Sequence, residues 1–85
     1  MLSDLVSMSL SILLKQLRER QRLRVADVAA LLDVSKSSIY AWESGENEPA
    51  PAQLLALANA YSATKKDRAE IARLRAFGPD EVIGD

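Results

Sequence analysis

The chain has 85 residues, of which 48% are hydrophobic and 27% charged, with a formal net charge of −1, so it fits one small globular domain rather than a disordered segment. It contains no cysteine and no histidine, which excludes a disulfide framework, a thiol nucleophile, the usual zinc ligands and the commonest general base. We therefore expect no enzyme activity, metal or cofactor, and no small-molecule ligand is evident.

The sequence starts without a basic segment of the kind that opens a signal peptide, and no apolar run approaches the length of a membrane span. We therefore expect a soluble, cytoplasmic protein that does not enter a membrane.

Apolar residues recur three and four positions apart from Leu2 to Leu17, which is the spacing of one helix face. One interpretation is a long first helix from about Ser3 to Arg22, closed by Leu23, with residues 1–9 as an N-terminal extension of the helix. The other is a shorter helix from about Ser9, preceded by an arm. Residues 1–9 would either add to the core or contact a second copy.

The spacing of apolar residues predicts a second helix from Val25 to Leu32. Four of its side chains are expected to face inward: Val28, Ala29, Leu31 and Leu32. Asp33 follows where the chain must turn sharply, and aspartate tolerates the left-handed backbone region. Val34 would then fill the corner before a third helix, which gives a helix-turn-helix pattern.

The third helix is expected from Ser35 to Ser44, with Ser35 as its N-cap and Gly45 as its stop. Ile39 and Trp42 are three residues apart, so one face can be buried. The opposite face carries a small polar stripe: Lys36, Ser37, Tyr40, Ala41 and Ser44. Such a helix can lie in the major groove of DNA.

Pro51 indicates the start of a fourth helix, because proline is favoured in a first turn. Its wide apolar face is expected to contain Leu54, Leu55, Leu57, Ala58 and Tyr61. Thr64 and Asp67 are typical of a capping box that begins a last helix, ending near Ala76 before Gly78-Pro79.

We thus divide the chain into a domain at 10–63, a last helix at 64–77 that could contact a second copy, and a tail at 78–85.

The stretch from Leu14 to Thr64 resembles the Cro/cI-type (Xre) helix-turn-helix family, which includes the lambda repressor DNA-binding domain. The matching residues are Leu17-Arg18-Glu19, Leu23, Val28-Ala29, Leu32, Val34-Ser35, Ser38-Ile39, Trp42-Glu43, Gly45, Pro49, Leu54-Leu55 and Leu57-Ala58. The resemblance implies an all-α fold, a compact bundle of five helices with the helix-turn-helix in the second and third. It also implies a bacterial or phage protein that regulates transcription.

The resemblance further assigns roles to individual positions. Lys36, Ser37 and Ala41 fall where base edges are contacted, and Ser35, Tyr40 and Ser44 fall where phosphates are contacted. Arg18 and Glu43 match a structural ion pair between the first and third helices.

Two departures from the family pattern predict weak DNA binding by a single copy. The usual Ser-Gln pair before the second helix is replaced by Arg24 and Val25, although Arg24 could contact phosphate through its charge. The loop after Gly45 carries Glu46 and Glu48, which repel phosphate.

We therefore expect a sequence-specific regulator of double-stranded DNA, a repressor acting as a homodimer. The alternative is a protein-interaction module of the same fold, such as an antitoxin or a transcription adaptor.

Overall fold

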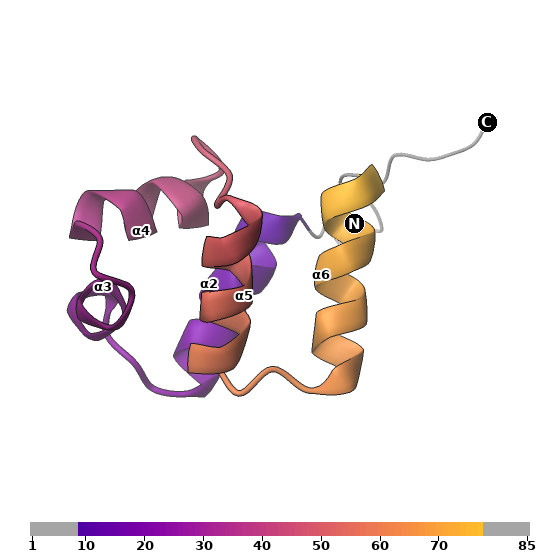
Figure 1. The fold of residues 1–85 in the computed structure, drawn as a ribbon, viewed down its shortest axis with the longest axis horizontal. Coiled ribbons are helices and arrows are strands. Elements are labelled where there is room, and N and C mark those ends of the chain that lie inside the picture. The colour runs from indigo at the N-terminus through magenta and orange to yellow at the C-terminus, as the bar shows by residue number, and fades with distance from the viewer. Residues whose placement is uncertain (1–8, 78–85) are drawn as a thin grey trace, which may run out of the picture.

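The computed structural model describes residues 9–77, and over that range the chain forms five helices and no strands (Figure 1). The helices are α2 (Leu10–Arg20), α3 (Val25–Leu32), α4 (Lys36–Ser44), α5 (Pro51–Ala60) and α6 (Lys65–Phe77). The expected all-α fold is confirmed. None of the helices within residues 9–77 has the length and apolar character that crossing a membrane requires.

The first described helix begins at Leu10, because Ser9 is its N-cap. Ser9 has extended backbone angles (φ −111°, ψ 166°), and its Oγ accepts a hydrogen bond from the Ile12 N–H at 3.4 Å. The interpretation of one continuous helix from Ser3 is therefore wrong, because the backbone of Ser9 is extended and not helical. The shorter helix is the correct alternative. The expected core or dimer contacts of residues 1–8 lie outside the described residues.

Helix α2 ends at Arg20 rather than at Leu23. Arg22 adopts a left-handed conformation (φ 59°), and the Leu23 N–H then donates to the Arg18 carbonyl oxygen at 3.2 Å. This turn directs Leu23 back against the core, where it is half-buried. Leu23 therefore closes the helix as expected, through its N–H and its packed side chain, although the helical residues end at Arg20.

Three more helices end in the same kind of left-handed turn. Asp33 (φ 57°) ends α3, Gly45 (φ 86°) ends α4 and Ser62 (φ 52°) follows α5. After each of them, the next N–H donates to a carbonyl oxygen five residues back, as in Val34 to Ala29 at 3.0 Å. The turns at Asp33 and Gly45 are confirmed as the sequence predicts them.

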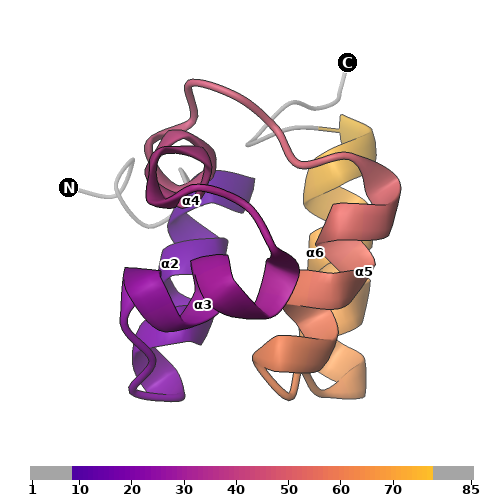
Figure 2. The same cartoon turned by 60° about the vertical axis from the view of Figure 1, so that its left-hand side comes forward.

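The core draws buried side chains from all five described helices. Its members are Leu10, Leu13, Leu14, Leu17, Val25, Val28, Ala29, Ile39, Trp42, Leu54, Leu57, Ala58, Tyr61, Ile71 and Leu74. Helix α2 packs against α4 and α6, and α3 packs against α4 and α5. Figure 2 shows that α3 and α4 run in clearly different directions, as the two helices of a helix-turn-helix do.

Two leucines that were expected in the core are on the surface. Leu31 is 64% exposed and Leu55 is 59% exposed. Each helix turns inward a stripe of residues spaced i, i+3, i+4 and i+7, which starts at Val25 in α3 and at Leu54 in α5. Leu31 and Leu55 lie outside these stripes, so the predicted inward orientation was wrong for both.

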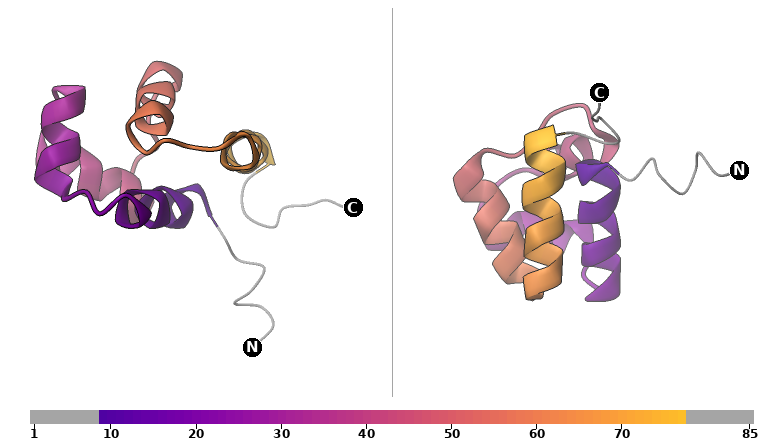
Figure 3. Two further views of the ribbon diagram at one scale, coloured as in Figure 1. Left: turned by 90° about the horizontal axis from the view of Figure 1, so that it is seen from below. Right: turned by 90° about the vertical axis from the view of Figure 1, so that its right-hand side faces the viewer.

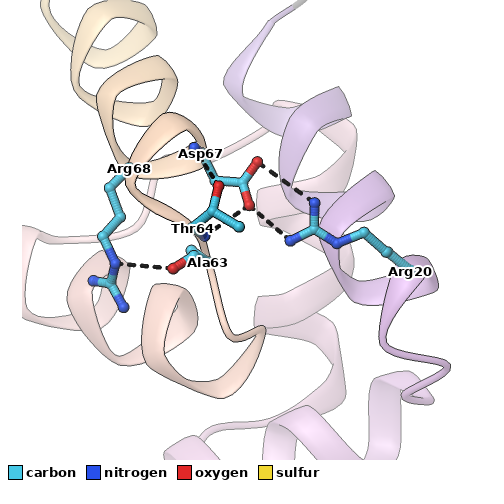
Figure 4. Close-up of polar contacts among 5 residues, drawn as sticks. All are labelled: Arg20, Ala63, Thr64, Asp67 and Arg68. Carbon is cyan, nitrogen blue, oxygen red and sulfur yellow. Dashed lines mark hydrogen bonds and ion pairs between the residues drawn. The ribbon is translucent and has the colours of Figure 1, made fainter.

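Helix α6 lies at the opposite end of the molecule from α3 and α4 (Figure 1). Its first turn is held by a capping box, as predicted: the Thr64 N–H donates to Asp67 Oδ2 at 2.8 Å, and the Asp67 N–H donates to Thr64 Oγ1 at 3.0 Å. The same carboxylate accepts from Arg20 Nη2 of α2 at 2.7 Å (Figure 4). Asp67 therefore caps α6 and also joins it to α2.

This arrangement predicts a pH-dependent stability. The hydrogen bond from Arg20 and the backbone bond from Thr64 lower the pKa of Asp67 to about 2, below its ordinary value near 3.9. The charged carboxylate thus stabilises the fold fully above about pH 5, and this part is lost as the pH falls toward 2. Asp67→Asn keeps an acceptor for the cap but removes the charge. We expect it to lower the free energy of unfolding at pH 5 by about 0.5–1 kcal/mol.

Urea denaturation between pH 5 and pH 2 measures this effect. The drop in stability over that range should be smaller in Asp67→Asn than in the unmodified chain, and Arg20→Gln should show the same reduction. An unchanged pH dependence in both variants would show that Asp67 does not carry it.

Candidate nucleic-acid interface

The rotation of α4 is fixed by its ends and by its buried face. The Ser38 N–H donates to Ser35 Oγ at 3.1 Å, which confirms Ser35 as the N-cap, and Gly45 ends the helix. Ile39 is 1% exposed and Trp42 is 6% exposed, so both side chains lie in the core as expected. The opposite face of α4 must therefore point outward.

That outward face carries the polar stripe that the sequence predicts. Lys36, Ser37, Tyr40 and Ser44 are exposed, and Ala41 is half-buried. No ion pair or hydrogen bond of the Lys36 side chain is found within residues 9–77. In this part of the chain its ammonium group has no protein partner and can donate to a ligand.

Two serines on this face already take part in internal hydrogen bonds. Ser35 Oγ accepts from the Ser38 backbone and lies 3.2 Å from Ser38 Oγ. Ser44 Oγ donates to the Ala41 carbonyl oxygen at 3.1 Å and accepts from the Glu46 N–H at 3.3 Å. The Ser44 hydroxyl must therefore give up its bond to Ala41 before it can donate to a phosphate.

A partly buried ion pair holds α4 against α2. Arg18 Nε donates to Glu43 Oε2 at 2.6 Å and Arg18 Nη2 donates to Glu43 Oε1 at 3.0 Å, with side chains only 12% and 7% exposed. Arg18 Nη1 also donates to the Leu23 carbonyl oxygen at 2.9 Å. The bond to Glu43 raises the pKa of Arg18 above its already high value. The pair implied by the resemblance is thus present, and it joins α2, α4 and the loop before α3.

Lys15 is a further candidate that the sequence analysis did not single out. A hollow of about 280 Å³ between α2 and α4 is lined by Lys15, Arg18, Tyr40, Glu43 and Ser44. An exposed cation thus lies at the edge of the outward face of α4. The signal was available, because Lys15 lies three residues before Arg18 and hence on the same face of α2.

Arg24 lies at the start of α3 and not on α4. Its N–H donates to Asp27 Oδ2 at 2.8 Å, which is one half of a capping box, whereas the acceptor that a serine side chain at position 24 would offer to the Asp27 N–H is missing. This backbone bond and the nearby guanidinium, whose Nε is 3.4 Å from Asp27 Oδ2, lower the pKa of Asp27. The charge of Arg24 is exposed but lies beside a carboxylate, which weakens its attraction for phosphate.

A protein-family model described as a helix-turn-helix domain matches residues 9–74, most of the chain. The chain belongs to the helix-turn-helix domain family. No curated protein matches it. The match begins at the N-cap of α2 and includes most of α6, and it agrees with the resemblance to Cro/cI-type domains. In this helix-turn-helix domain, α3 and α4 are the two helices of the motif.

Proposed function

We propose that this helix-turn-helix protein is a sequence-specific regulator of transcription that binds double-stranded DNA as a cytoplasmic homodimer and acts as a repressor. The observation that carries the proposal is the outward stripe of α4, whose cation Lys36 has no partner within residues 9–77. Burial of Ile39 and Trp42 determines which face of α4 points outward. The Arg18–Glu43 ion pair holds α4 against α2. We assign no reaction to the chain.

The proposed contacts follow from the chemistry of each side chain. Lys36 can donate to guanine O6 and N7, Ser37 to several base edges, and Ala41 can contact only a thymine methyl group. Phosphate contacts come from residues with an exposed donor, and these position the helix without reading sequence. They are Ser35 at the N-cap of α4, Tyr40 and Ser44 on α4, Lys15 on α2 and Arg24 before α3.

The dimer is proposed because the cations around α4 are few. Neutralising few phosphates gives a small gain from counterion release, and two copies double it. A symmetric dimer would place two recognition helices in successive major grooves, about 34 Å apart. Helix α6 lies at the far end of the molecule from α4 (Figure 1), so a second copy can contact it while α4 stays open. A dimer seated on a promoter would exclude the polymerase.

Selection of bound sequences from a random duplex library tests this proposal, followed by titration of the selected duplex at several salt concentrations. We expect a palindromic site, and a logarithm of the binding constant that falls linearly with the logarithm of salt concentration. Absence of any enriched sequence, together with no duplex binding at low salt, would contradict the proposal.

The alternative, a protein-interaction module, is favoured by one feature: Glu46 and Glu48 are exposed directly after α4. If DNA is the partner, Glu46→Lys with Glu48→Lys should tighten duplex binding and steepen its salt dependence, because two repulsive charges become attractive. If a protein is the partner, the double variant should instead lose a stoichiometric complex and gain no duplex affinity. Duplex titration and pull-down of the two proteins separate these outcomes.

A further inference from the structure

An apolar groove of about 240 Å³ runs between α5 and α6, which lie side by side (Figure 3). Leu54, Ala58 and Ile71 form its buried floor. Leu55 rises beside the floor on α5 with 59% of its surface exposed, and Ala72 faces it from α6. An apolar group that binds over this exposed leucine and the apolar hollow beside it is stabilised, because both apolar surfaces are removed from water.

Two arginines of α6, Arg68 and Arg75, also line the groove. Arg68 donates to the Ala63 carbonyl oxygen at 3.1 Å (Figure 4). It also donates to Asn59 Oδ1 at 3.1 Å, and neither acceptor is charged. Neither arginine forms an ion pair with a carboxylate of residues 9–77, whereas Arg18, Arg20 and Arg24 each do. The groove therefore favours a segment with apolar residues at its centre and acids at its ends.

The chain itself contains such a segment one residue after the end of α6. Residues 79–85 read Pro-Asp-Glu-Val-Ile-Gly-Asp, with Val82 and Ile83 between acids on both sides. The segment follows Phe77, the last residue of α6, and Arg75 lies two positions earlier. Arg75 and Arg68 are separated by seven residues of helix, about 10 Å, and six extended residues span about 20 Å. The segment is therefore long enough to return along the groove.

We propose that residues 79–85 dock into the α5–α6 groove of the same chain. Val82 and Ile83 cover Leu55 and Ala72, Asp80 and Glu81 lie near Arg75, and Asp85 lies near Arg68. Docking removes the exposed leucine from water and gives the two arginines their carboxylate partners. It also keeps a second copy from using this groove. The proposal does not depend on DNA binding.

The absence of cysteine makes a direct test possible, because one introduced thiol can carry a nitroxide label at a single position. We choose Gly84→Cys in the full chain, since it preserves every acid of the segment. In a ¹⁵N-labelled sample, the amide signals of Leu55, Ala58 and Ala72 should lose most of their intensity through broadening by the nitroxide. The signals of α3 should keep theirs.

Groove variants with matched controls show whether the broadening reports docking. Leu55→Asp and Arg75→Glu, each made in the labelled chain, should restore the Ala58 and Ala72 signals. Leu31→Asp changes an equally exposed leucine on α3, and Lys66→Glu makes the same charge change on α6 outside the groove lining; neither should restore them.

Two results would overturn the proposal. One is broadening confined to the last turn of α6, which would mean that the segment does not return along the groove. The other comes from mixing ¹⁵N chains without nitroxide and unlabelled chains with it. Broadening of Leu55 in that mixture would mean that the segment belongs to a second copy. Docking within one chain leaves the mixed sample unbroadened.

Discussion

Glu43→Gln should lower the free energy of unfolding by about 2 kcal/mol, because it leaves the partly buried charge of Arg18 without its carboxylate. Arg18 is only 12% exposed and reaches Glu43 through two hydrogen bonds. Removing one member of a buried pair costs more than the pair itself contributes. The loss should appear as a lower urea midpoint, followed by the fluorescence of Trp42, the only tryptophan and a core residue.

Two controls show whether burial is the cause. The double variant Arg18→Met with Glu43→Leu replaces the pair by apolar side chains and should recover most of the lost stability. Glu70→Gln removes a carboxylate from an exposed pair with Arg73 and should cost less than about 1 kcal/mol. A loss as small as this in Glu43→Gln would contradict the role given to the buried pair.

Lys36→Ala should weaken binding to the selected duplex by about ten-fold to a hundred-fold, the usual effect of losing one specific base contact. Its side chain is exposed and has no hydrogen bond or ion pair within residues 9–77, so the free energy of unfolding should change little. The variant should also accept more bases at one position of each half-site. Titration against the selected duplex and single-base variants of it measures both effects.

The matched control is Lys66→Ala, which removes the same charge from α6 at the far end of the molecule (Figure 1). It should leave both affinity and base preference close to those of the unmodified chain. If the two lysine variants weaken binding equally and uniformly for all duplexes, Lys36 acts only through the overall field and does not read a base.

Helix α4 was largely predictable because its determinants are local. Ser35 caps the helix through an N–H three residues away, Gly45 supplies the positive φ that its end requires, and Ile39 with Trp42 fixes the buried face. Each of these signals lies within the helix or next to it. The Arg18–Glu43 pair joins residues that are 25 positions apart, and it was expected only from the resemblance.

The errors arose where several positions satisfied the same local rule. In α3 and α5 an extra leucine stands beside a complete inward stripe, and only the neighbouring helices decide that Leu31 and Leu55 stay outside. The position of Lys15 beside Tyr40 also depends on how α2 and α4 pack. Contacts between distant residues, such as Arg20 with Asp67, have no local signature.

The double attachment of Asp67 has a consequence for how the molecule comes apart. One carboxylate accepts the Thr64 N–H that starts α6 and the Arg20 guanidinium of α2. If the first turn of α6 unwinds, the carboxylate moves and Arg20 is released; if Arg20 is released, the turn loses part of its support. Fraying of this helix end and its separation from α2 should therefore occur as one cooperative opening, seen as a shared rate of amide hydrogen exchange.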